Sequence, residues 1–144
     1  MDKLIEVPTE EEMTYIARQW ILANRMSEEL SSISLDRTIK DLSGLQKILD
    51  ANILTVEHSN QLSAVGIAFA QVFINEVSDY DWWMVEDEYG RDVAVRYKET
   101  SLVIFPESMI SNRIEENFSF TIDGLFDDLK NDLDKIIEEH YQDA

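Results

Sequence analysis

The spacing of apolar residues predicts five helices, three before the central part of the chain and two after it. In each of these stretches apolar positions recur every three or four residues, which places them on one face of a helix. The predicted helices span about residues 10–30, 35–50, 57–77, 109–116 and 121–140. The helix 57–77 is apolar around most of its circumference, so we expect it to be buried at the centre of the fold.

Polar residues at the expected helix starts indicate where several of these helices begin. Thr9 and Glu12 have the spacing of a capping box, in which each side chain accepts a hydrogen bond from the backbone N–H of the other residue. Ser34 or Asp36 is expected to cap the second helix, and Ser108 the fourth.

Two residues inside the predicted helices indicate how those helices pack. Trp20 lies on the apolar face of the first helix, and we expect its large ring to be anchored in the core. Gly66 has no side chain, so the backbone of a neighbouring element could approach the helix 57–77 closely at this position.

The apolar pattern changes to a period of two between residues 82 and 105, which predicts three antiparallel strands at 82–86, 93–98 and 102–105. Gly90 lies in the first connection and is expected to adopt a positive φ, while Pro106 ends the third strand. The third strand is apolar at every position and is therefore expected to be covered on both faces.

Within the first predicted strand the side chains alternate between two faces of the sheet. Trp83 and Val85 should share one face, and Trp82, Met84 and Glu86 the other. The sequence predicts that the face carrying Trp82 is the outer one, which would make this tryptophan an exposed contact.

These elements together predict an α+β fold, with helices packed around a small three-stranded antiparallel sheet. The chain has 144 residues, 44% of them hydrophobic, which suits a single domain covering 1–144. No apolar run is long enough to span a bilayer, and the first residues lack the pattern of a signal peptide. The chain has no cysteine, which excludes disulfides and is compatible with a cytosolic location.

The charge of the chain favours one class of partner over others. Thirty acidic residues face 12 basic ones, giving a formal net charge of −18. Such a field repels nucleic acid and anionic membranes, and it accelerates association with a basic protein. The alternative interpretation is that the acidity only confers solubility. The sequence does not indicate an oligomeric state.

The residue types needed for common catalytic mechanisms are largely missing. There is no thiol, no nucleophile elbow and no phosphate-binding glycine loop, and the chain has only two histidines. The acidic residues show no spacing that selects a metal, so we expect neither a metal nor another cofactor.

Two acidic stretches remain as candidate sites for contact with a partner. The first is Glu86, Asp87 and Glu88. Two of these carboxylates could also act as acid and base in catalysis, but alternation along a strand should point Glu86 and Asp87 apart. The preferred interpretation over catalysis is ion pairing with Arg91, Arg96 or Arg113. The second stretch is the acidic face of the last helix, which is either a solvated surface or a docking surface for basic groups. Its candidate contacts are Asp127, Asp128 and Asp132.

The central part of the chain resembles a bacterial family known as domain of unknown function 3806. The resemblance covers about residues 42–126 and rests on four motifs in a fixed order. They are Leu62-x-x-Val65-Gly66-x-Ala68-Phe69, Trp83-x-Val85-x-Asp87-x-Tyr89-Gly90-Arg91, Val103-x-Phe105-Pro106 and Met109-Ile110-Ser111-x-Arg113. The resemblance implies an α+β fold with a short antiparallel sheet and no established activity.

Structural roles can explain the matching residues that are polar or conformationally special. Gly90 suits the turn and Pro106 the end of the third strand. We expect Asp87 and Arg113 to form an ion pair that links the hairpin to the helix after the third strand.

Three functional hypotheses follow from these observations. The leading one is a non-enzymatic acidic interaction protein, in its sharpest form an immunity protein that masks the basic active site of a toxin. The second is an enzyme or small-ligand domain that uses Asp87, Tyr89, Arg91 and Arg113. The third is an oligomerising scaffold that associates through Trp82.

Overall fold

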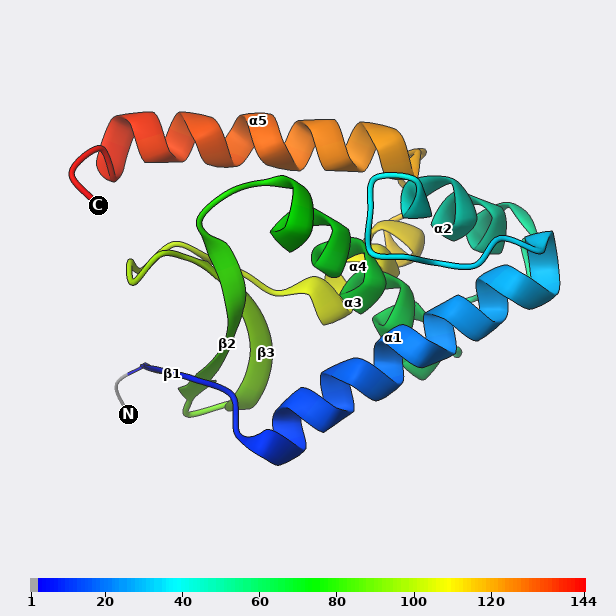
Figure 1. The fold of residues 1–144 in the computed structure, drawn as a ribbon, viewed down its shortest axis with the longest axis horizontal. Helices are drawn as coiled ribbons and strands as arrows, with labels where there is room; N and C mark the ends of the chain where they lie inside the picture. The colour runs from blue at the N-terminus through cyan, green and yellow to red at the C-terminus, as the bar shows by residue number, and fades with distance from the viewer. Residues whose placement is uncertain (1–2) are drawn as a thin grey trace.

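The computed structural model describes residues 3–144 and confirms the α+β class. The elements follow the order β1 (Leu4–Glu6), α1 (Glu10–Ser31), α2 (Asp41–Asp50), α3 (Ser59–Glu76), β2 (Tyr80–Asp87), β3 (Gly90–Tyr97), β4 (Val103–Ile104), a 3-10 turn η1 (Pro106–Ser108), α4 (Met109–Glu115) and α5 (Ile122–His140). The sheet is antiparallel in the order β1-β2-β3-β4 (Figure 1). Within residues 3–144 no helix is both long and apolar enough to cross a membrane.

Helix α3 lies at the centre of the fold, as its apolar pattern predicts. Every residue from Leu62 to Ala70 is buried, because other elements cover the helix on several sides. Phe69 and Phe73 meet the ring of Phe126 edge-on, with ring centroids 6.1 and 5.6 Å apart. Phe73 also packs against Tyr80 at 4.9 Å, which joins α3 to both α5 and the sheet.

The sheet has four strands, so the prediction of three was one short. Leu4–Glu6 pairs with β2 through Leu4 opposite Glu86 and Glu6 opposite Met84. Three residues are too few for a period of two to be recognised in the sequence, and the strand is defined by its partner rather than by its own pattern.

The alternation predicted for β2 is confirmed, but the assignment of its two faces was wrong. Trp82 and Met84 face α3 and are 6% and 4% exposed. The Trp82 indole N–H donates to the Gln71 side-chain oxygen at 3.0 Å, which satisfies its polar atom. Trp83 and Val85 therefore occupy the outer face, and Trp82 is not available for association.

The end of the sheet and two of the predicted caps also differ from expectation. Strand β4 is only two residues long, and Phe105 beyond it is exposed, so the stretch is not covered on both faces.

Helix α2 begins at Asp41 rather than near residue 35. The Asp41 carboxylate accepts from the backbone N–H groups of Asp36 and Arg37, which closes a turn in front of the helix. Ser108 makes no capping hydrogen bond at α4.

Three predicted features of the helices are confirmed. Thr9 and Glu12 form both hydrogen bonds of the capping box, at 2.9 and 3.1 Å. Trp20 packs half-buried against the core, and the Arg37 guanidinium covers its ring at 3.8 Å. Gly66 permits a close backbone approach, since a Cβ there would lie 2.0 Å from the Pro106 carbonyl oxygen.

The substitution Gly66→Ala should lower the free energy of unfolding by about 3 kcal/mol, because the added methyl group must displace the backbone of η1. Urea unfolding followed by circular dichroism measures this change. Gln61→Ala on the same helix, which adds no atom at a crowded position, is the matched control and should change stability little. Equal stabilities of the Gly66→Ala and wild-type proteins would contradict the close contact.

Candidate functional site

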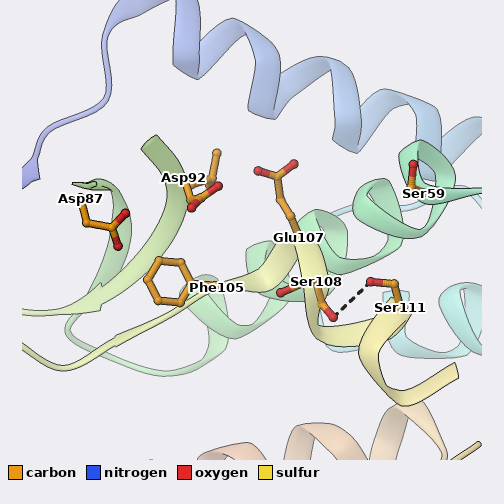
Figure 2. Close-up of a pocket in the computed structure, with 8 residues that line it drawn as sticks. Ser59, Asp87, Asp92, Phe105, Glu107, Ser108 and Ser111 are labelled. Atoms are coloured by element: carbon orange, nitrogen blue, oxygen red, sulfur yellow. Dashed lines mark hydrogen bonds between the residues drawn. The ribbon is translucent and has the colours of Figure 1, made fainter. Parts of the chain in front are cut away.

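An acidic pocket of about 420 Å³ lies where the β2–β3 hairpin meets η1 and α4 (Figure 2). It is lined by Ser59, Asp87, Asp92, Val93, Phe105, Glu107, Ser108 and Ser111. No lysine, arginine or histidine from residues 3–144 lines it. Three carboxyl groups beside an aromatic ring make a pocket that suits a positively charged group with some apolar surface.

The sheet supplies one side of this pocket. Asp87 ends β2, and Asp92 lies on β3 opposite Val85, so both carboxyl groups are on the outer face. Figure 2 shows the ring of Phe105, which follows β4, close to these two side chains. The Asp87 Oδ1 atom accepts from the Tyr89 backbone N–H at 2.8 Å, which fixes the side chain at the start of the turn.

A hydrogen-bond network orients Glu107, which η1 supplies on the other side of the pocket. The hydroxyl groups of Tyr15 and Ser63 both donate to its Oε2 atom, Ser63 at 2.7 Å. Gln19 donates to the Ser63 hydroxyl at 3.2 Å and to the Asn60 side-chain oxygen at 3.1 Å. Burial and the hydrogen bond to Glu107 raise the pKa of the Tyr15 phenol, in that order of importance.

This network leaves one carboxylate oxygen of Glu107 available to accept a hydrogen bond. Within the described part of the chain, Oε1 of Glu107 accepts no hydrogen bond from another residue. Because Oε2 is held by α1 and α3, the carboxyl group cannot rotate freely. A ligand with N–H groups would therefore find a positioned acceptor at low entropic cost.

Arg91 points away from the acidic pocket and holds the N-terminal segment against the hairpin. Its guanidinium bonds to Glu12 at 2.7 and 3.0 Å and to Glu6 at 2.6 Å. Glu86 lies 3.7 Å away, which confirms the expectation that this residue forms an ion pair at the hairpin. The hydrogen bonds from Arg91 lower the pKa of Glu12 from 4.5 to about 2.

Arg113 is also separate from the acidic pocket, so the predicted Asp87–Arg113 ion pair was wrong. Its guanidinium donates to the Met109 carbonyl oxygen at 3.0 Å, back along its own helix. It lines a different pocket of about 410 Å³, together with Phe118 and Asp128. The four residues of the small-ligand hypothesis, Asp87, Tyr89, Arg91 and Arg113, therefore do not form one site.

The acidic face of α5 is a second candidate surface, distinct from the acidic pocket. Asp127, Asp128 and Asp132 are exposed, and only Asp128 borders a pocket. Lys130 pairs with Asp134 at 2.9 Å on the same helix. Glu88 is exposed in the β2–β3 turn and does not line the acidic pocket.

Sequence reasoning found Asp87 but missed Asp92 and Glu107. The register of a hairpin with a short turn would have placed Asp92 on the same face as Asp87, since Val85 pairs with Asp92. Glu107 had no such signal, because the packing of η1 on α3 positions it. Among residues 3–144 no three acidic or histidine side chains are grouped so as to hold a metal ion.

The chain belongs to the family described as "Domain of unknown function (DUF3806)", whose model matches residues 41–126. No curated protein matches the chain. The fold is similar to a crystal structure from Bacteroides thetaiotaomicron VPI-5482 at 1.50 Å resolution, with a TM-score of 0.80 and 14% sequence identity. The match covers 88% of this chain and 47% of that one, so this chain spans about half the length of its structural relative.

The substitution Glu12→Gln should lower the free energy of unfolding by about 1 kcal/mol at pH 7, the scale of a partly exposed ion pair. Because folding lowers the pKa of Glu12, its charge stabilises the fold fully above pH 4.5, and this contribution is lost as the pH falls towards 2. The difference between wild type and variant should therefore shrink by more than half between pH 7 and about 3.

Urea unfolding at a series of pH values measures this difference. Glu11→Gln removes a neighbouring exposed charge and serves as the control, with a small effect at every pH. The expectation would be contradicted if wild type and Glu12→Gln differed in free energy of unfolding by the same amount at every pH. The contact between Arg91 and Glu12 would then not depend on the charge of Glu12.

Proposed function

We propose that this domain binds a basic protein partner and catalyses no reaction, and that the acidic pocket receives a cationic side chain of that partner. The observation that carries the proposal is the lining of this pocket. Asp87, Asp92 and Glu107 are among its lining residues, and no basic residue of the described chain is. A lysine or arginine side chain would gain charge-assisted hydrogen bonds there.

The charge of the whole molecule supports the same partner chemistry. A net charge of −18 attracts a basic protein over distances up to the screening length and increases its association rate. In its most specific form the proposal describes a cytosolic immunity protein, which covers the basic surface of a toxin by charge complementarity.

A small cationic ligand is the second candidate, and the size of the pocket favours it. A volume of about 420 Å³ lies within the range of small-molecule sites. Such a ligand would use the same carboxyl groups, with its apolar part against Phe105. Agmatine, a free amine with a guanidinium group, is a suitable probe for this alternative.

Neutralising the pocket should weaken binding of a fluorescent decapeptide of lysine and glycine by at least about tenfold, the effect of losing a charge-assisted contact worth about 1.4 kcal/mol. The variant carries Asp87→Asn, Asp92→Asn and Glu107→Gln, and fluorescence anisotropy at near-physiological salt measures its affinity. The control carries Asp127→Asn, Asp128→Asn and Asp132→Asn, which changes the net charge equally and should alter the affinity about twofold or less.

Three outcomes would contradict the proposal, two from this experiment and one from a titration with agmatine. Equal losses in the two triple variants would mean that the peptide responds only to net charge. An absence of binding to the wild-type protein at low salt would mean that the domain does not recognise basic segments. Tight binding of agmatine without binding of the peptide would favour the small-ligand candidate instead.

Reversing charges on α5 should mainly slow association. With Asp127→Lys, Asp128→Lys and Asp132→Lys, the association rate of the same peptide at low salt should fall about tenfold, while the dissociation rate changes little. Stopped-flow fluorescence separates the two rates. An unchanged association rate would remove α5 from the surface that attracts the partner.

A further inference from the structure

The outer face of the sheet carries a second apolar cluster that does not belong to the main core. Strand register places Ile5, Trp83, Val85, Ala94 and Val103 on this face. Val85 and Ala94 are 2% and 0% exposed, and their larger neighbours are half-buried. None of the five packs in the main hydrophobic core, which lies on the opposite side of the sheet around α3. Figure 1 shows α1, α3 and α4 on that side, while α5 runs past the end of the sheet.

This apolar face borders the acidic pocket, which also reaches Val93 on the inner face and Ser59 at the start of α3. Asp87 and Asp92 lie on the same face as Trp83 and Val85, and they line the pocket together with Phe105. Phe105 is 38% exposed and follows directly after β4, next to Val103 in the alternation. A partner that places a cation in the pocket would therefore lie beside the apolar cluster.

A basic residue on this face, Arg96, is already engaged within the domain. Its Nε–H donates to the Thr100 carbonyl oxygen at 2.6 Å, and its guanidinium lies 4.4 Å from the centre of the Trp83 ring. This cation–π contact places the positive charge over the tryptophan ring. The carboxyl groups of Asp87 and Asp92 have no such basic partner among residues 3–144, so they remain available for an incoming cation.

We propose that the outer face of the sheet is the docking surface for a segment of another protein in which basic and apolar side chains alternate. A lysine or arginine of this segment enters the acidic pocket, while its apolar side chains cover Ile5, Trp83 and Val103. This inference rests on the proposed function and adds the location and chemistry of the interface.

Charge complementarity and the shape of the sheet select this occupant. A second copy of the chain would bring Asp87 and Asp92 close to identical carboxyl groups, which like-charge repulsion disfavours. Addition of a strand at a sheet edge is also disfavoured, because β1 has three residues and β4 only two. An amphipathic basic segment that lies across the face would pack its apolar side chains on the apolar cluster and place its basic side chains near Asp87 and Asp92.

The test compares two probes, an acetylated and amidated hexapeptide that alternates leucine and lysine, and hexalysine blocked in the same way. The alternating peptide should bind at least about fivefold more tightly than hexalysine at near-physiological salt, although it carries half the charge. Nuclear magnetic resonance titration should show saturable shifts of the Trp83 indole N–H and the Val103 methyl groups.

A matched pair of variants locates the apolar contribution. Ile5→Ser with Val103→Ser should remove the preference for the alternating peptide and change the affinity for hexalysine less than twofold. The control, Ile53→Ser with Val56→Ser, alters two exposed apolar residues outside the sheet and should preserve the preference. Circular dichroism verifies that both variants are folded.

The outcomes distinguish this inference from the proposed function. If both peptides bind equally well and the Ile5 and Val103 substitutions do not change their affinity, the docking surface is overturned. If that binding still requires Asp87 and Asp92, the proposed function remains intact. Failure of both peptides to bind would overturn both proposals. A dimer of the protein alone that Ile5→Ser with Val103→Ser dissociates would show that a second copy covers the face.

Discussion

The contact between Gly66 and the Pro106 carbonyl group is the constraint on which the candidate site depends. Helix α3 is the most buried element of the domain, and η1 can lie against it only because Gly66 has no side chain. This approach places Glu107 within reach of the Ser63 and Tyr15 hydroxyl groups. The same packing places η1 against β3, so the position of Glu107 at the acidic pocket depends on one close contact in the core.

The domain uses its few cations to organise a large excess of carboxylates. Arg91 forms ion pairs with Glu6, Glu12 and Glu86. These contacts connect β1 and the start of α1 to the hairpin. Arg96 is held against Trp83 on the outer face. The acidic groups that remain without such partners include those of the pocket and many on α5. Their mutual repulsion is a cost that a basic partner would relieve, which is the physical basis for the proposed interaction.

The outer face of the sheet and the acidic pocket share Asp87, Asp92 and Phe105, so two kinds of chemistry lie next to each other. Apolar residues contribute affinity that depends little on salt, whereas carboxyl groups orient a basic partner and increase its association rate. A surface of this kind discriminates better than charge alone, because a partner must match both parts at once. The structural relative shares the fold only, and these local features carry the argument about binding.

The sequence by itself determined the five helices, the central position of α3, the capping box of Thr9 and Glu12, and the alternation along β2. These features depend on residues close together in the chain, so local spacing contains the information. Only the tertiary structure decided which face of β2 is buried, that β1 exists, and that Arg91 rather than Arg113 links the hairpin to another element. The partners of Arg91 on α1 and β1 lie 79 and 85 residues away in the sequence. Contacts over such separations are set by how elements pack, and alternation alone assigns side chains to two faces without saying which one the helices cover.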